Sequence, residues 1–416
     1  MSDVLAVVNI GQLVTLAGPS RPRVGGELRE LSIIPNAALL VWDGRIAAAG
    51  PYAELRSKIP ADAVVIDAEE RCVTPGFVDA HTHLIFAGNR ALEFEQRIAG
   101  ASYQEIAAAG GGILRTVALT RAASQDELLA AARRHRDWML RSGTTTIEAK
   151  SGYGLERATE MKMLRVIARL GEEGPARIVP TLLAAHTVPP EFAARRDEYV
   201  RSVAEELIPE VAAAGLARYC DVFCDDHAFT VDEARGVLTA ARRQGMGLRV
   251  HAEQFRSGTG AALAAELGAA TADHLEAIED EDIHHLWTTG TQPVLLPCSV
   301  FALGRTQYPP ARAMVDAGLA IVVATDFNPG SSPIASMPFV FSLACLQMGL
   351  TPAEALTAAT INAAWSLELG NCVGSLETGK QADFLIHEFD DYRELAYFIA
   401  APARPQVFVA GREVTR

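Results

Sequence analysis

Apolar and polar positions along the middle of the chain alternate between two textures. Short, continuous apolar runs with the length of buried strands are separated by longer segments with helical periodicity. The eight strand-like runs are residues 76–81, 144–149, 178–184, 220–224, 248–252, 270–274, 293–296 and 320–325. Strands that alternate with helices predict a parallel sheet, and eight such units predict a (β/α)8 barrel.

Several helices between these runs carry start and stop signals. A serine or threonine followed three residues later by glutamate predicts a capped helix start, at Ser124, Thr230 and Thr351. Glycine is typical of the residue after a helix and predicts three helix ends. These glycines are Gly143, Gly171 and Gly245.

Both ends of the chain consist of short strand-like runs without helices between them. Near the N-terminus, Asp43-Gly44 separates two runs and predicts a tight hairpin turn. Neither end could bury its apolar face alone, so we expect them to pair with each other. The predicted fold is therefore α/β: a (β/α)8 barrel at residues 73–368 and a small β-sandwich domain built from both chain termini, residues 1–72 plus 369–416.

The composition excludes several classes of protein. Hydrophobic residues make up 49% and charged residues 21%, as in ordinary globular chains. A net charge of −14 argues against nucleic acid or an anionic membrane as a partner. The first arginine is Arg21, so no basic signal sequence is expected, and the six cysteines lack the spacing of a disulfide framework. We expect a cytoplasmic protein with a small-molecule substrate, no nucleic acid and no membrane contact.

The active site of such a barrel lies at the carboxyl ends of its strands. The first strand ends at His81 and His83, whose spacing places both imidazoles on one face. The fifth strand ends at His251, and Asp326 follows the eighth. Nitrogen and oxygen ligands of this kind suit Zn²⁺ or Fe²⁺, so we propose these four residues as metal ligands.

Other histidines divide into two groups. His274 ends the sixth strand and is left over as an acid or base, and His186 follows the third strand. The remaining ones are expected in helices, in loops or at the surface. They are His135, His227, His284, His285 and His387.

The residues around the first strand resemble a known superfamily. The sequence TPGFVDAHTH at 74–83 is similar to the first-strand signature of the amidohydrolases, which combine a barrel with a small β-sandwich from both termini. Six further motifs resemble the imidazolonepropionase family. They are HTHLIFAGNR (81–90), KSGYGL (150–155), AHTVPP (185–190), HAEQ (251–254), ADHLE (272–276) and ATDFNPGS (324–331).

The resemblance implies a reaction and a cofactor. The implied enzyme is a hydrolase of histidine degradation that opens the ring of 4-imidazolone-5-propanoate to N-formimino-L-glutamate. A metal-activated water would attack the ring carbonyl, giving an oxyanion near the metal and His186. One divalent metal per subunit, Zn²⁺ or Fe, and a homodimer are also implied.

The resemblance also assigns roles to individual residues. The implied substrate-binding residues are Arg90, Tyr153, His186, Gln254, Asn328, Gly330 and Ser331. The candidate proton-transfer residues are His274, Asp326 and Glu253, and which of them is the general base stays open. Tyr153 lies between two glycines, which predicts a mobile loop over the site.

Two departures from related patterns narrow the alternatives. Metal-dependent deaminases carry a glutamate where this chain has Gln254, and an amide is no carboxylate base. The fourth strand brings no lysine, since Lys150 belongs to the second, so we expect one metal, with Cys224 or Asp225 as the residues that could hold another. A heterocycle deaminase and a non-catalytic scaffold remain the alternative functions.

Overall fold

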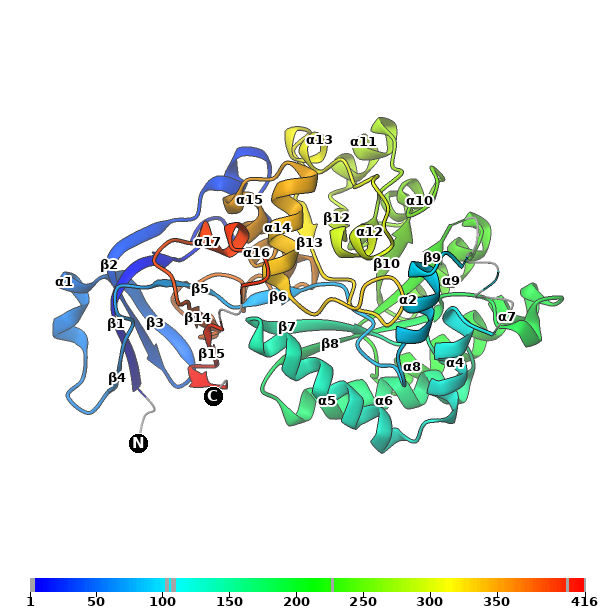
Figure 1. The fold of residues 1–416 in the computed structure, drawn as a ribbon, viewed down its shortest axis with the longest axis horizontal. Helices are drawn as coiled ribbons and strands as arrows, with labels where there is room; N and C mark the ends of the chain where they lie inside the picture. Colours follow the sequence, from blue (N-terminus) through cyan, green and yellow to red (C-terminus); the bar gives the residue numbers. More distant parts are fainter. Residues whose placement is uncertain (1–3, 102–104, 106–109, 226–227, 402–403, 415–416) are drawn as a thin grey trace.

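The computed structural model describes residues 4–101, 105, 110–225, 228–401 and 404–414. The molecule is elongated, with a strand-rich body beside a larger body of strands and helices (Figure 1). The first and last segments of the chain both belong to the strand-rich body (Figure 1). The prediction that both ends form one β-domain is therefore confirmed.

Eight parallel strands form the larger body, and each pairs with the next one along the chain. They are β6 (Phe77–Asp79), β7 (Thr144–Lys150), β8 (Arg177–Ala185), β9 (Tyr219–Cys224), β10 (Gly247–Ala252), β11 (Thr271–His274), β12 (Gln292–Leu295) and β13 (Val322–Val323). Every one of these strands overlaps a predicted run, so the barrel prediction is confirmed. The last strand is shorter than expected, with only two residues.

Helices cover the outside of these strands (Figure 1). They include α2 (Ala91–Ile98), α4 (Ile113–Ala122), α5 (Gln125–Arg141), α6 (Arg157–Glu173), α7 (Arg196–Ser202), α8 (Ile208–Ala213), α9 (Val231–Arg243), α10 (Gly260–Glu266), α11 (Asp280–Thr289), α12 (Pro297–Ala302), α13 (Ala311–Asp316), α14 (Met337–Met348), α15 (Pro352–Ala358) and α16 (Ile361–Ser366). Within the described ranges, no helix is both long and apolar enough to cross a membrane.

The predicted helix starts are confirmed. The side chains of Ser124, Thr230 and Thr351 each accept the backbone N–H of the glutamate three residues later. The helix end predicted at Gly171 is wrong, because α6 continues to Glu173. Its terminating residue is Gly174, which takes the positive φ of 54° that a side chain would disfavour.

A hydrogen-bonded seam closes the barrel between the first and last strands. The Thr325 N–H and hydroxyl both donate to the buried Asp79 carboxylate, at 3.1 and 2.6 Å. Just beyond, Asp326 N–H donates to the His81 carbonyl at 3.1 Å, and His83 N–H donates to the Phe327 carbonyl at 2.9 Å. The seam thus places the ends of the first and eighth strands side by side.

The strand-rich body is one mixed sheet built from both ends of the chain. Its strand order is β16-β15-β14-β5-β1-β2-β3, and β4 also pairs with β1. These strands are β1 (Val4–Val14), β2 (Ile33–Trp42), β3 (Arg45–Pro51), β4 (Val64–Asp67), β5 (Cys72–Pro75), β14 (Phe384–Ile386), β15 (Gln406–Val409) and β16 (Arg412–Glu413). The Asp43-Gly44 hairpin is confirmed, with positive φ at both residues. The edge strand β3 also bonds to the segment before β14, since Ile46 N–H donates to the Lys380 carbonyl at 2.9 Å.

Apolar side chains join the two bodies. Leu385 and Val407 of the terminal sheet are part of the large core that fills the barrel side. The short helix α17 (Glu394–Tyr397) lies against α14 (Figure 1), and the Ser342 hydroxyl donates to the Ala396 carbonyl at 2.9 Å. The division into domains at 72/73 and 368/369 remains our proposal, with β5 leading from one body to the other.

The apolar interior of the terminal sheet yields a stability prediction. Phe384 and Phe408, on neighbouring strands, stack with ring centroids 4.4 Å apart and are buried. Phe408→Ala should lower the free energy of unfolding by about 3–5 kcal/mol, because it leaves a cavity in this core. Tyr397→Ala, which truncates a side chain with 75% exposure, is the control and should change stability little. Equal denaturant midpoints for both variants would contradict the assignment of this core.

Candidate metal centre and active site

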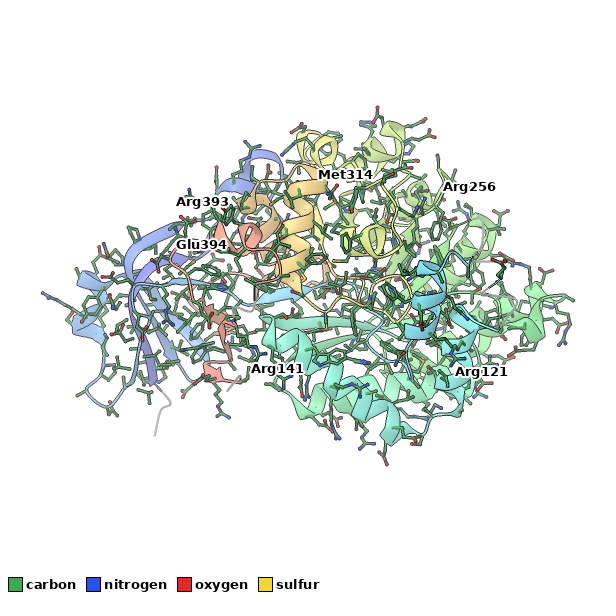
Figure 2. All side chains as sticks on the ribbon, viewed as in Figure 1. Arg121, Arg141, Arg256, Met314, Arg393 and Glu394 are labelled. Carbon is green, nitrogen blue, oxygen red and sulfur yellow. The ribbon has the colours of Figure 1, made fainter. Side chains whose placement is uncertain are left out.

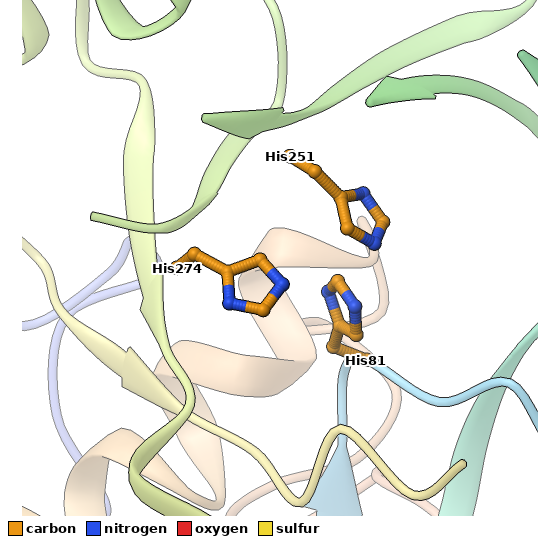
Figure 3. A group of neighbouring side chains, drawn as sticks. All are labelled: His81, His251 and His274. Atoms are coloured by element: carbon orange, nitrogen blue, oxygen red, sulfur yellow. The ribbon is translucent and has the colours of Figure 1, made fainter. Parts of the chain in front are cut away.

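Five side chains from four barrel strands converge at the carboxyl ends of the barrel. Two overlapping groups have ligand atoms within 4.8 Å of one another; they are His81, His251 and His274, and His81, His83 and Asp326. The first group is drawn in Figure 3, where the three rings lie close together. Asp326 Oδ1 lies 3.5 Å from His81 Nε2 and 3.4 Å from His83 Nε2. His251 Nε2 lies 3.5 Å from His83 Nε2.

The atoms at the centre of this cluster fit a metal ion. His81 Nε2 and Asp326 Oδ1 are buried and have no hydrogen-bond partner among the described residues. The opposite nitrogens of two rings are anchored: His81 Nδ1 lies 2.6 Å from Asp273 Oδ2, and His251 Nδ1 lies 3.1 Å from Asp221 Oδ1. A carboxylate on Nδ1 fixes the tautomer and directs the lone pair of Nε2 towards the centre, as in known metal sites.

Burial keeps these imidazoles neutral, which is the form that binds a metal. Burial lowers the pKa of His83 to about 3, and the nearby Lys150 ammonium adds to the effect. Burial also lowers the pKa of His251 to about 4, although Asp221 opposes this shift. The pKa of His81 lies well below its ordinary value for the same reason, burial followed by the charge of Lys150.

A buried ion network lies beneath the histidines. The Lys150 ammonium contacts Asp221 Oδ2 at 2.8 Å and Glu148 Oε1 at 3.0 Å, and all three side chains are fully buried. The Arg249 guanidinium lies 3.4 Å from Asp273 Oδ2 and is also fully buried. Burial alone would lower the pKa of Lys150, but Asp221 and Glu148 outweigh it and raise that pKa. Each carboxylate that orients a histidine therefore has its own buried cation.

These network residues were not predicted from the sequence. Lys150 was assigned to a strand without a role, and Asp221 and Arg249 were not considered. A signal was present: Arg249 and His251 are two residues apart in one strand, so their side chains point to the same side. Arg249 therefore faces the same side as the predicted ligand His251, in a strand that is buried on both faces. A charged residue in such a position indicates a buried counter-ion.

Strained backbone clusters around the site. His274 has a φ of 81° and Leu275 one of 69°, while Glu253 and Asp326 have values of 48° and 53°. Residues with side chains rarely adopt this left-handed region, and such strain concentrates at functional sites.

His274 Nδ1 lies 3.4 Å from Glu276 Oε1. Burial lowers the pKa of His274, but Glu276 leads the groups that raise it above its ordinary value.

Arg90 lies at the N-terminal boundary of α2, where its Nε donates to the Thr116 hydroxyl at 3.0 Å. A Cβ at residue 330 would overlap the Arg90 guanidinium, so a side chain there would displace the arginine from this position. Asn328 holds the same loop, since its Oδ1 accepts the N–H groups of Gly330 and Ser331 at 2.8 and 2.7 Å. The structure thus brings Arg90 beside the loop at residues 328–331.

Tyr153 and His186 lie beside the histidine cluster. The His186 ring stacks on His83 at a centroid distance of 5.0 Å, and the Tyr153 ring is 5.9 Å from His83. Tyr153 has only 2% exposure, and its loop is held by several hydrogen bonds, unlike the mobile loop expected from its glycines. His186 Nδ1 lies 2.9 Å from the Gly152 carbonyl, and burial followed by the charge of His83 lowers the pKa of His186 to about 3.

Glu253 and Gln254, two and three residues after His251, differ in their surroundings. Glu253 accepts the N–H of Gly260 at 2.8 Å and that of Ala261 at 3.1 Å, at the start of α10. Burial raises the pKa of Glu253 to about 7. These bonds favour a role in holding α10, and its role in proton transfer stays a prediction. Gln254 is buried, and its backbone carbonyl accepts from a terminal nitrogen of Arg305 at 3.2 Å.

The other histidines have the following positions. His284 and His285 lie on α11, as expected. His135 is on α5 but is buried, and its Nδ1 lies 3.0 Å from the Leu84 carbonyl. His387 is also buried, 2.8 Å from the Thr74 hydroxyl, and is no surface residue. His227 lies outside the described residues.

The expectation of a single metal depends on the end of β9, where Cys224 and Asp225 were the residues that could hold a second one. Cys224 is buried, and Asp225 Oδ2 accepts the Phe255 N–H at 3.1 Å. In the described part of the chain, neither residue belongs to a group that could hold a metal. A single ion thus remains our expectation.

Comparison with known families and proteins adds a second line of evidence. Residues 72–414 match the model of the amidohydrolase family. Over 416 residues the chain is 56% identical to the imidazolonepropionase of Solibacter usitatus (strain Ellin6076), with 100% of this chain and 99% of the relative covered. It is 47% identical over 411 residues to the imidazolonepropionase of Symbiobacterium thermophilum (strain DSM 24528 / JCM 14929 / IAM 14863 / T), covering 98% and 96% of the two chains.

Solved structures share the fold at much lower identity. An adenosine deaminase from Xanthomonas campestris with bound zinc superposes with a TM-score of 0.71 at 20% identity, covering 98% of this chain and 92% of that one. The guanine deaminase of E. coli gives a TM-score of 0.68 at 17% identity, covering 99% of both chains. These likenesses establish the combination of barrel and terminal sheet.

The ion network yields a prediction for Lys150. Lys150→Met leaves three buried carboxylates with one cation, so the free energy of unfolding should fall by about 3–5 kcal/mol. Lys162→Met is the matched control, because the Lys162 ammonium donates only to backbone carbonyls in the hydrogen bonds that the structure shows for it. Denaturant unfolding measures both variants, and a Lys150→Met protein as stable as the wild type would contradict the network.

Proposed function

The chain belongs to the amidohydrolase family and, within it, to the imidazolonepropionases, and we propose that the buried histidine site opens the ring of 4-imidazolone-5-propanoate. The product is N-formimino-L-glutamate, an intermediate of histidine degradation. The observation that carries this function is a guanidinium, that of Arg90, on the loop after the first-strand histidines. A substrate with a carboxylate arm beside a hydrolysable ring matches that arrangement, because Arg90 can bind the carboxylate.

The ligands for one divalent metal are His81, His83, His251 and Asp326. Three neutral imidazoles and one carboxylate suit Zn²⁺ or Fe²⁺ and leave room for a water. When bound, the metal lowers the pKa of that water and polarises the substrate carbonyl. His274, which lies in the same cluster, keeps its Nδ1 against Glu276 and serves proton transfer in this proposal.

Substrate is oriented from the rim of the site. The planar guanidinium of Arg90 binds the propanoate arm as a two-pronged donor. Tyr153 and Gln254 flank the ring, and Asn328 with Gly330 and Ser331 contact substrate or product. Thr116 holds Nε of Arg90, which leaves both terminal nitrogens of the guanidinium for the carboxylate.

His186 binds the ring as an acceptor. A carbonyl oxygen only accepts, so the contact with Gly152 requires Nδ1–H as the donor. Because its lowered pKa keeps the ring neutral, Nε2 then carries a lone pair. We therefore assign His186 to a ring N–H of the substrate, in place of the oxyanion contact that the sequence suggested.

The reaction consumes one water. The water oxygen bonds to the ring carbonyl carbon, and the bond from this carbon to the adjacent ring nitrogen breaks. His274, with Asp326 as the other candidate, takes the proton of the water and delivers it to the departing nitrogen. The carbonyl carbon becomes the α-carboxylate, and the N–C–N unit becomes the formimino group.

The alternative of a heterocycle deaminase is weaker. A neutral heterocycle offers no carboxylate for Arg90, and Gln254 cannot replace a catalytic glutamate.

We further propose a cytoplasmic enzyme, because all six cysteines are free thiols. The homodimer implied by the resemblance stays a prediction, which light scattering can test.

The proposed reaction can be followed directly. The purified enzyme should consume 4-imidazolone-5-propanoate, measured as loss of ring absorbance, and the rate should fall at least a hundredfold after dialysis against a chelator. Zn²⁺ or Fe²⁺ should restore it, because the histidine cluster then regains its ion. Wild-type protein with bound metal but no turnover would contradict the assignment.

Arg90→Ala should raise KM for 4-imidazolone-5-propanoate by about tenfold to a hundredfold, since a charge-assisted bond of about 1.5–3 kcal/mol is lost. An imidazolone without the propanoate arm should be turned over equally by wild type and variant. Arg169→Ala, which removes a surface arginine paired with Asp126, is the control. An unchanged KM in Arg90→Ala would show that another group holds the arm.

A further inference from the structure

The loop at residues 151–155, between β7 and α6, folds around one buried carboxylate. Glu160 Oε1 accepts the N–H groups of Gly154 and Leu155, at 2.7 and 2.8 Å, and Oε2 accepts that of Gly152 at 3.0 Å. The Ser151 hydroxyl also bonds to this side chain. Glu160 is fully buried in the first turn of α6. Four donors from one short loop thus meet on a single side chain.

The rest of the loop is equally constrained. Arg121, labelled in Figure 2, donates from Nε to the Gly154 carbonyl at 2.7 Å and from a terminal nitrogen to the Leu155 carbonyl at 3.2 Å. A Cβ at residue 154 would lie 2.7 Å from the backbone nitrogen of Glu160 and 2.8 Å from its Oε1. Glycine at this position therefore allows the loop to close on the carboxylate.

Two side chains of the proposed substrate site depend on this loop. Tyr153 is part of it, flanked by two of the N–H groups that Glu160 accepts. His186 depends on it through the Gly152 carbonyl, which accepts Nδ1–H at 2.9 Å. Displacement of Gly152 would therefore change both the position of the tyrosine ring and the tautomer of the histidine.

We propose that Glu160 is a positioning residue, which sets Tyr153 directly and His186 through Gly152 by gathering the N–H groups of the loop. It touches neither the metal ligands nor the substrate. The role in substrate binding rests on the proposed function, whereas the effect on the loop does not. Because Tyr153 and His186 bind substrate before and during the reaction alike, loss of Glu160 acts on binding more than on the chemical step.

Glu160→Gln tests this with little change in size. An amide offers one acceptor oxygen, so one loop N–H must face the NH2 group and lose its partner. Hydrogen exchange at the amides of Gly152, Gly154 and Leu155 should accelerate at least tenfold in the variant. KM for 4-imidazolone-5-propanoate should rise tenfold or more, while kcat stays within about threefold.

Glu354→Gln is the matched control. Glu354 is another buried glutamate that accepts a backbone N–H, from Thr351, but it caps α15 and contacts Arg29 and Arg312. Its variant should leave KM and exchange in the 151–155 loop unchanged. If Glu160→Gln gives too little folded protein, Glu160→Asp provides the same comparison, because the shorter carboxylate cannot reach the N–H groups of Gly152, Gly154 and Leu155 together.

The outcomes distinguish the positioning role of Glu160 from the proposed function. Faster exchange confined to the loop together with a raised KM supports the proposal. Exchange equal to the wild type, or a loss in kcat with unchanged KM, overturns it. Wild-type protein that fails to open the imidazolone overturns the proposed function alone, because the exchange measurement reads the role of Glu160 in the loop without substrate.

Discussion

The need to pair every charge inside the barrel governs the rest of the site. A buried carboxylate without a partner costs several kcal/mol, and the barrel centre contains Glu148, Asp221 and Asp273 with no exposure. Lys150 on β7 pairs with Asp221 on β9, and Arg249 on β10 pairs with Asp273 on the adjacent β11. Asp273 and Asp221 can then hold His81 and His251 by Nδ1. The histidine cluster therefore rests on two cations that need not contact the ion themselves.

The loops around the histidine cluster are also held in place by neighbouring residues. The barrel seam brings Asp326 beside His81, Asn328 folds the following loop, and Glu160 folds the loop of Tyr153. Strained backbone at His274 and Asp326 persists because these surroundings fix it. In the proposed site, rigid strands supply the metal ligands, and hydrogen-bonded loops supply the substrate contacts. Precision in both parts comes from side chains that do not take part in the reaction.

Much of the fold follows from local sequence pattern. The barrel strands are continuous apolar runs, and the capping boxes at Ser124, Thr230 and Thr351 are local signals that the structure confirms. Gly171 misled the prediction, because a glycine tolerated inside a helix has the same sequence signature as one that ends it. The helix ends instead at Gly174, which takes a positive φ and is followed directly by Pro175.

The candidate site was predicted less completely than the fold. The convergence of His81, His83, His251, His274 and Asp326 follows from strand ends meeting at one face of the barrel. The counter-ions were missed, since pairing Lys150 with Asp221 requires knowledge of how distant strands align. Glu160 was missed for a similar reason: its role depends on the path of the loop around it.

Anomalous X-ray diffraction at the zinc and iron absorption edges tests the central claim most directly. The account predicts one ion, bonded at about 2.0–2.2 Å to Nε2 of His81, His83 and His251 and to an oxygen of Asp326. Lys150 should remain on Asp221, below the ion. An ion bound without His83 and Asp326, or a second ion at His274, would contradict it.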